Sequence, residues 1–230
     1  EDGTYILVGS SGATPKFKED GKLVPDEKFN TAFLYNPEGK QAEKQYNKIH
    51  LVPFGEKMPF KGTCEPLYKM FMMFSPYEYD YTLDPGEEYT IFEIGPEEGI
   101  VEKKYRFGVL ICYEDTVPKM ARKFTWQRQK GKQVDWLVNI SNDGWFVKFE
   151  EGRVLPSFEL AQHAAVCVFR AVENRVSIVR SVNAGISCII DPNGNIRDGY
   201  MAGTLAEKPL ERKAEAGWFA DRVLIDSRIT

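Results

Sequence analysis

The chain has 230 residues, of which 43% are hydrophobic and 28% charged, the balance of an ordinary globular protein. Its net charge of −4 comes without a block of Lys and Arg that could follow a phosphate backbone, so nucleic acid is not expected as a partner. The apolar runs are far shorter than the about 20 residues of a membrane span, and four scattered cysteines with two histidines match neither a disulfide framework nor a zinc site, so no metal or cofactor is expected.

The N-terminal part of the chain predicts strands. Residues 4–8 form an apolar, β-branched run that ends in Gly and Ser at 9–12, which indicates a strand that leads into a loop holding Ser10 and Ser11. Residues 31–35 and 41–47 flank a turn-forming stretch, which predicts a hairpin. This hairpin is expected to deliver Lys48 at its end.

The segment 57–88 is irregular and rich in proline, and it carries a cluster of Met and aromatic residues between Tyr68 and Tyr77. A loop of this length inside a domain is usually functional or disordered. Two interpretations remain open at this point. The cluster could form a short helix packed on the core, or a lid over an apolar substrate or against a membrane, because Met-rich surfaces adapt to apolar ligands.

The second half of the chain alternates strands with helices. The expected helices are 118–130 and 159–175, the second with an inward stripe of Leu160, Ala164, Val168 and Val172. Several runs are apolar without a period of two, which is typical of strands covered on both faces. The pattern predicts an α/β fold in a single domain that spans 1–230. The expected strands are 89–94, 107–112, 136–140, 176–182, 185–191 and 222–226.

Cys112 lies where a buried strand ends, six residues before the proline that begins the next helix. Such turns display nucleophiles in α/β enzymes, and helix N-termini there favour a thiolate. Acyl transfer also needs a base and donors for the oxyanion, which Lys and Glu can supply without His. This directs attention to Lys48 and Glu56, although core packing for the cysteine and solvation for the lysine are the ordinary roles.

Four segments in order and spacing resemble the nitrilase superfamily and, within it, the apolipoprotein N-acyltransferases. These are KIHLVPFGE (48–56), GVLICYE (108–114), VNISNDGWF (138–146) and QHAAVCVFRAVENRVSIVRSVNAGISCIID (162–191). The resemblance implies a four-layer αββα sandwich of the nitrilase type with a Glu-Lys-Cys catalytic triad. It covers most of the chain.

By the same resemblance, Cys112 is the nucleophile and Lys48 stabilises the oxyanion. Glu56 matches the family's further acidic residue, and Tyr113 and Glu114 match the positions beside the nucleophile that the family requires.

Tyr113 and three further residues are candidates for substrate binding, whereas Glu56 and Glu114 are candidates for catalysis. The Asn-Asp-Gly-Trp stretch after the strand at 136–140 is strong turn chemistry, and its Asn142 and Trp145 could line a pocket at the same time. His50, two residues after Lys48, is interpreted as a hydrogen-bonding partner that positions its neighbours. His163, Arg170 and Glu173 are interpreted as structural support on one helix.

The sequence departs from the family pattern in two places. The family's general-base Glu would lie upstream of Glu1, so the first strand and helix of the domain are expected to be missing from this chain. Asn183, Ala184 and Gly185 stand where the family usually has Asn-Thr-Gly. The first departure puts the activity of this segment alone in question.

The resemblance implies an N-acyltransferase that moves a fatty acyl chain from a phospholipid, through a cysteine thioester, to the N-terminal amine of an apolipoprotein. It also implies a catalytic domain on the periplasmic face of the bacterial inner membrane, associated with the membrane through flanking spans. Two alternatives stay open: a soluble nitrilase-family amidase that hydrolyses a small amide, and an inactive nitrilase-like binding domain.

Overall fold

The computed structural model describes residues 3–17, 20–74, 81–95 and 104–226. The chain forms two compact units, residues 1–88 and 89–230. Among the described residues, no helix is both long and apolar enough to cross a membrane.

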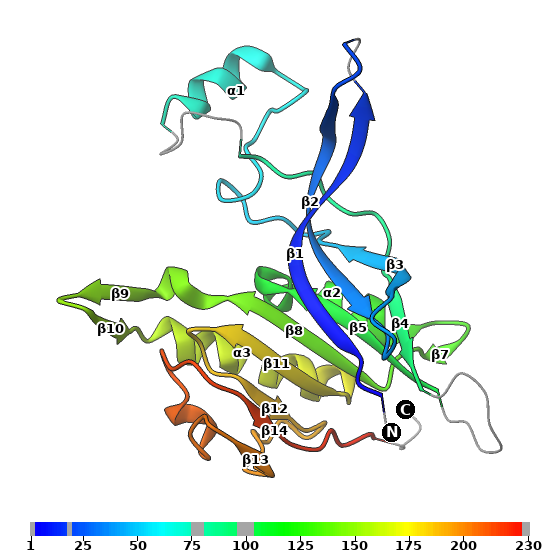
Figure 1. Cartoon of the computed structure of the whole chain (residues 1–230), viewed down its shortest axis with the longest axis vertical. Coiled ribbons are helices and arrows are strands. Elements are labelled where there is room, and N and C mark those ends of the chain that lie inside the picture. The colour runs from blue at the N-terminus through cyan, green and yellow to red at the C-terminus, as the bar shows by residue number, and fades with distance from the viewer. Residues whose placement is uncertain (1–2, 18–19, 75–80, 96–103, 227–230) are drawn as a thin grey trace. The chain divides into compact units, whose positions relative to one another are not determined.

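The first unit is built on a three-stranded antiparallel sheet in the order β1-β2-β3 (Figure 1). The predicted hairpin is confirmed: β2 and β3 flank a tight turn in which Gly39 has a φ of 77°, a left-handed conformation that glycine adopts without strain. Lys48 follows β3 directly, as predicted. The strands are β1 (Ile6–Phe17), β2 (Leu23–Tyr35) and β3 (Gln41–Asn47).

The loop predicted at 9–12 is wrong, because these residues lie inside β1. Ser10 pairs with Thr31 in the ladder between β1 and β2, so the Gly and Ser residues continue the strand. The sheet also accounts for Gly12, since a Cβ atom there would lie 2.3 Å from Oγ1 of Thr31. Pairing with a long partner strand outweighs the local turn signal.

A short helix, α1 (Glu65–Met72), forms within the segment 57–88. The interpretation as a helix is therefore correct. The expected packing on the core is not observed, because none of the helix residues is buried. The ring of Phe71 stacks on Phe60, with centroids 5.8 Å apart, and tilts against Phe54. The end of the predicted cluster, with Tyr77, lies outside the described residues.

The second unit contains a five-stranded mixed sheet in the order β12-β11-β8-β5-β4. The central strands β11, β8 and β5 run parallel to one another, and the edge strands β4 and β12 are antiparallel to their neighbours. Parallel strands place their carboxyl ends at one edge of a sheet, where ligands and catalytic groups collect in α/β folds. The strands are β4 (Ile91–Ile94), β5 (Tyr105–Ile111), β8 (Trp136–Asn142), β11 (Ser177–Asn183) and β12 (Cys188–Ile190).

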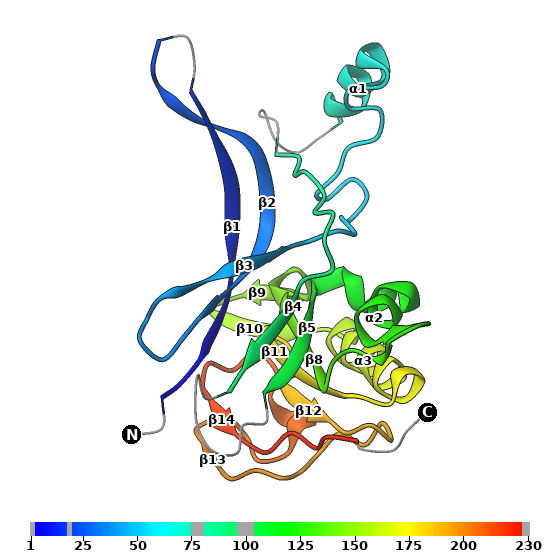
Figure 2. The ribbon, with the colours of Figure 1, turned by 90° about the vertical axis from the view of Figure 1, so that its right-hand side faces the viewer.

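Two helices, α2 (Pro118–Thr125) and α3 (Glu159–Asn174), lie together on one face of this sheet (Figure 2). The central strands bury Val109, Leu110 and Leu137 completely, which fits their apolar runs. The alternation of strand and helix predicted for this half of the chain is therefore confirmed, with a packed core between α3 and the sheet.

The buried stripe of α3 differs from the prediction. Leu160 and Ala164 are buried, but Val172 is exposed, and Cys167 and Ala171 complete the inward face instead. A spacing of exactly four residues drifts around a helix that has 3.6 residues per turn, so the inward face follows spacings of four, three and four.

Two further predictions at element ends are wrong. The helix expected to reach residue 130 ends at Thr125, because Trp126 is extended and begins a small hairpin of β6 and β7. The strand expected at 222–226 is irregular, and the short strand β14 precedes it. The remaining small strands are β6 (Trp126–Gln127), β7 (Gly131–Lys132), β9 (Val147–Glu150), β10 (Arg153–Pro156), β13 (Ala202–Gly203) and β14 (Phe219–Ala220).

Candidate active site

Cys112 is the first residue of a 3₁₀ turn, η1 (Cys112–Thr116), which follows the buried strand β5. Its φ is 51°, a left-handed conformation that is strained for a residue with a side chain and that is often found at functional sites. The carboxylate of Glu114, fully buried, accepts a hydrogen bond of 2.8 Å from the backbone N–H of Ile111 and braces the turn. Cys167 and Cys188 are buried, whereas Cys112 and Cys64 are only half-buried.

Asp115, in η1, has a fully buried carboxylate. Three side chains bind it, two from α3 and one from β11. His163 Nε2 lies 2.9 Å from Oδ2 of Asp115, and Arg180 Nη1 lies 3.4 Å from the same oxygen. The thiol of Cys167 donates to it at 3.2 Å. The turn that carries Cys112 is thus anchored through Asp115 to α3 and β11.

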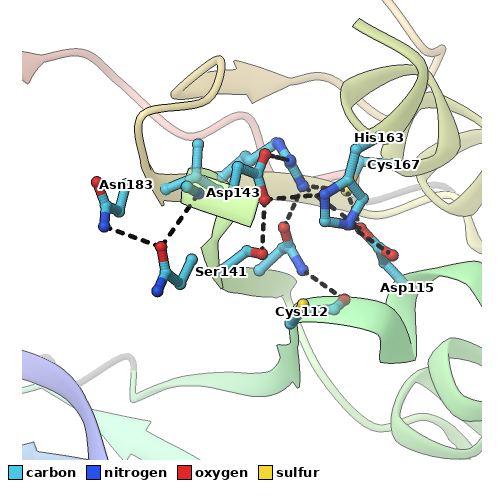
Figure 3. A network of polar contacts seen from close by, with 12 residues as sticks. Cys112, Asp115, Ser141, Asp143, His163, Cys167 and Asn183 are labelled. Carbon is cyan, nitrogen blue, oxygen red and sulfur yellow. Dashed lines mark hydrogen bonds and ion pairs between the residues drawn. The ribbon is translucent and has the colours of Figure 1, made fainter. Parts of the chain in front are cut away.

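A second buried carboxylate, Asp143, completes this network (Figure 3). It begins the 3₁₀ turn η2 (Asp143–Phe146) at the end of β8. Arg180 Nη2 donates to its Oδ2 at 2.6 Å, while His163 Nδ1 and the hydroxyl of Ser141 bind its Oδ1 at 3.0 and 2.7 Å. Figure 3 shows the imidazole of His163 between the two carboxylates.

Arg180 also connects the network to the backbone of the Cys112 turn. Its guanidinium, fully buried on β11, donates to the side-chain oxygen of Asn139, and the amide nitrogen of Asn139 donates to the carbonyls of Leu110 and Cys112 at 3.1 and 3.5 Å. Arg170 adds a bond of 3.1 Å to the carbonyl of Asp115. Side chains from β8 and α3 therefore fix the backbone on both sides of Cys112.

The electrostatics of the network follow from burial and close opposite charges. Burial lowers the pKa of His163, but its bonds to Asp115 and Asp143 outweigh burial and raise this pKa to about 9. Burial raises the pKa of Asp143, and the bond to His163 with the charge of Arg180 reverses this, so that the pKa is lowered. Burial and the charge of Asp115 raise the pKa of the Cys167 thiol. Cys167 is consequently an unreactive thiol.

The stability of the protein should therefore fall as the pH rises from about 6.5 to about 9. A group whose folded pKa is raised stabilises the fold below its unfolded value, and His163 loses this contribution as the pH passes through its folded pKa. The difference corresponds to roughly 3 kcal/mol. Urea unfolding at pH 6 and pH 9 would measure it, and His163→Gln should make the curve much flatter over this range. Equal free energies of unfolding at both pH values would contradict the assignment.

The Asn-Asp-Gly-Trp stretch forms the predicted turn, η2. The side-chain oxygen of Asn142 accepts bonds from the N–H of Gly144 and from Nδ2 of Asn183, at 3.1 and 2.9 Å. Trp145 exposes 76% of its surface, and Tyr113 in η1 exposes 38%. Both aromatic side chains are open to contact with a ligand, while the oxygen of Asn142 serves the turn itself.

In the first unit, Lys48 and Glu56 lie together, as the sequence motif suggests. Lys48 is completely buried, and its Nζ lies 2.6 Å from Oε2 of Glu56. The same carboxylate accepts bonds from the N–H of Val52 and from Asn30. His50 is exposed beyond this pair. The fold thus builds a buried ammonium with a fixed carboxylate partner.

The side chains that support the Cys112 turn were not predicted from the sequence. His163 and Arg170 were expected to be ordinary helix residues, although both are buried, and Asp115 and Arg180 were not among the predicted site residues. A signal was available, since Arg180 interrupts an apolar strand and Asn139 interrupts another, and buried strands rarely carry such residues without partners.

Comparison with known proteins connects this chain to one family. The sequence pattern of the family described as carbon-nitrogen hydrolase matches residues 1–205. An apolipoprotein N-acyltransferase of Geobacter metallireducens is 36% identical over 194 residues, and apolipoprotein N-acyltransferase 2 of Treponema denticola is 38% identical over 193. Each alignment covers 84% of this chain and 31% of the relative, so the chain spans less than a third of these proteins.

Solved structures agree on the fold. Two variants of the amidase from Nesterenkonia sp. AN1, with covalent additions at their active-site cysteine, align with TM-scores of 0.55 and 0.54 at 15% and 16% identity. Each alignment covers 96% of this chain and 62% of the amidase. The α/β sandwich fold of the nitrilase type, predicted from the sequence, is thereby confirmed.

Proposed function

The chain belongs to the carbon-nitrogen hydrolase family, and from this premise we propose that it carries the catalytic centre of an N-acyltransferase. The acyl chain of a phospholipid passes through a thioester at Cys112 to the α-amino group of the N-terminal cysteine of an apolipoprotein. The substrates are inferred from relatives named apolipoprotein N-acyltransferase. One observation of geometry supports the nucleophile: Cys112 alone among the four cysteines stands at a strained strand end above a buried charge network.

The proposed reaction has two acyl transfers. In the first, Sγ of Cys112 attacks the ester carbonyl, and the alcohol of the lysophospholipid leaves with a proton. In the second, the amine attacks the thioester, an amide forms, and the thiol is released. Each tetrahedral intermediate carries an oxyanion, and the ammonium of Lys48, held by Glu56, stabilises it.

We assign the remaining candidates accordingly. The two units form one catalytic domain, Glu114 is a further catalytic residue of the Cys112 turn, and Tyr113, Asn142, Trp145 and His50 belong to the substrate-binding surface. The segment 57–88 binds acyl chains, which is supported by Met73 and Phe74, each 83% exposed beside α1. The reaction takes place at the periplasmic face of the bacterial inner membrane.

Trapping the acyl-enzyme tests the proposal directly. The full-length gene product is incubated with a radiolabelled phospholipid in the absence of acceptor, digested, and mapped by mass spectrometry. We expect a hydroxylamine-sensitive acyl group on the peptide with Cys112, which a diacylglyceryl-modified N-terminal Cys peptide then removes. An adduct on Cys64 instead, or turnover of small amides without labelling by lipid, would reject the acyltransferase.

Glu56→Gln should lower kcat by about 10- to 100-fold, because a buried ammonium loses its charged partner and no longer holds its position. The steady-state rate of acyl transfer by the full-length protein measures this. Glu27→Gln is a suitable control, since Glu27 is exposed and its side chain accepts a hydrogen bond from the exposed Thr14 within the part of the chain that the structure describes. Activity of the Glu56 variant equal to that of the control would show that the pair is not used in catalysis.

A further inference from the structure

His163 is held in a way that identifies its protonation state without reference to titration. Nδ1 of its ring lies 3.0 Å from a carboxylate oxygen of Asp143, and Nε2 lies 2.9 Å from one of Asp115. An ionised carboxylate only accepts hydrogen bonds, so both ring nitrogens must donate, and only the imidazolium cation carries two N–H groups. The ring is nearly buried, with 9% exposed, so water does not replace these partners.

The charges around the ring agree with a cation. Asp115 from η1 and Asp143 from η2 contact it directly, and Arg180 from β11 and the thiol of Cys167 from α3 bind the same Asp115 carboxylate. Phe146 contacts it edge-on. Two carboxylates are balanced by Arg180 and a charged His163, whereas a neutral imidazole would leave one buried negative charge without compensation.

The two carboxylates belong to different turns, and His163 joins them. Asp115 lies three residues after Cys112, and Asp143 follows Asn142. The only other side chain in the described residues that binds both carboxylates is Arg180, which approaches from the sheet while His163 approaches from α3. His163 and Arg180 each bind both carboxylates, and together they fix the position of η1 relative to η2. We call this pair of cations, with the two carboxylates, the clamp.

We propose that the imidazolium of His163 is a positioning residue for acyl transfer, which holds the turn of Cys112 and the turn of Asn142 in their active arrangement. The inference rests on the proposed role of Cys112 as nucleophile. It adds that transfer proceeds only while the clamp is charged, so that deprotonation of His163 disengages Nδ1 or Nε2 from its carboxylate and lets the two turns separate.

The protonation state can be measured on the wild-type protein, which removes the risk that a variant misfolds. ¹⁵N-histidine labelling of the full-length protein gives one set of ring signals for each histidine, and the set that disappears in His163→Gln belongs to His163. We expect both nitrogens of His163 to be protonated at pH 7 and the ring to titrate near pH 9. A neutral ring at pH 7 would overturn the proposal.

The pH dependence of kcat separates positioning from mere structural support. In the full-length wild-type protein, kcat should have an alkaline limb near pH 9. His163→Gln should lower kcat about 100-fold at pH 7.5 with little change in KM, since a small displacement of a catalytic group has this effect. His163→Arg keeps a cation with several donors, so it should recover part of the activity and lose the limb near pH 9.

Asp191→Asn is the matched control. Asp191 is a buried carboxylate of the same unit that binds the turn of Asn193 and Asn195, apart from the clamp. It should lower the melting temperature and leave the limb near pH 9 in place. If His163→Gln, shown to be folded by circular dichroism, has wild-type kcat and the same limb, the positioning role is wrong. If Cys112→Ser retains transfer, the proposed function fails instead, whatever the histidine variants do.

Discussion

Replacing Cys112 by serine should lower acyl transfer by about 1,000-fold or more, the largest effect expected of any single change in the chain. A serine hydroxyl is far less ionised than a thiol at neutral pH, and the site offers it no histidine base of the kind that activates serine in a triad. The side chain keeps its size and its half-buried place, so the free energy of unfolding should change by less than about 1 kcal/mol.

The measurement is the rate of transfer from phospholipid to a lipid-modified Cys peptide, together with the amount of trapped acyl-enzyme. Cys64→Ser is the matched control, because Cys64 is also half-buried and precedes α1 in the other unit. It should retain nearly full activity. A Cys112→Ser protein with more than a tenth of the wild-type rate would exclude a thioester mechanism.

Replacing Arg180 by methionine should have the largest effect on stability, with a loss of about 3–5 kcal/mol in the free energy of unfolding. Arg180 is fully buried and lies within ion-pair distance of both Asp115 and Asp143. Without it, two buried carboxylates share one imidazolium, and Asn139 loses the donor that orients it. Methionine fills much of the volume, so the loss comes mainly from the uncompensated charge.

Urea unfolding of the chain, monitored by circular dichroism, measures this loss. Lys208→Met removes a cation from an exposed pair with Glu211 and should cost no more than about 1 kcal/mol. Adding Asp143→Asn to the Arg180 variant should restore part of the stability, because one unpaired charge disappears with it. Additive losses in the double variant would mean that the two side chains do not interact.

The elements that carry local signals could be predicted from the sequence. The strand before Cys112 and the proline at the start of α2 predicted the turn that carries Cys112, and the turn formers between β2 and β3 predicted the hairpin that leads to Lys48. The Asn-Asp-Gly stretch marked η2. In each case the preference of a few neighbouring residues and the tertiary structure agree.

Features that depend on distant partners could not be predicted in this way. The Gly and Ser residues of β1 resemble a loop until β2 is paired with them. The clamp consists of Asp115, Asp143, His163 and Arg180, which come from four elements, so no short stretch of the sequence contains all of its members. The local signal for the clamp is Arg180, a charged residue within an apolar strand. It indicates a buried ion pair once the strand is known to be buried.

The left-handed backbone of Cys112 affects how the protein responds to heat and denaturant. Relaxation of that residue to an ordinary conformation would release about 1–2 kcal/mol and turn the thiol away, and the bonds at Glu114, Asn139 and Asp115 prevent it. The residue that we propose as the nucleophile is therefore held in a strained conformation by its surroundings. Heat or denaturant that loosens these bonds should displace the thiol before the sheet unfolds, so we expect the proposed activity to be lost before the fold.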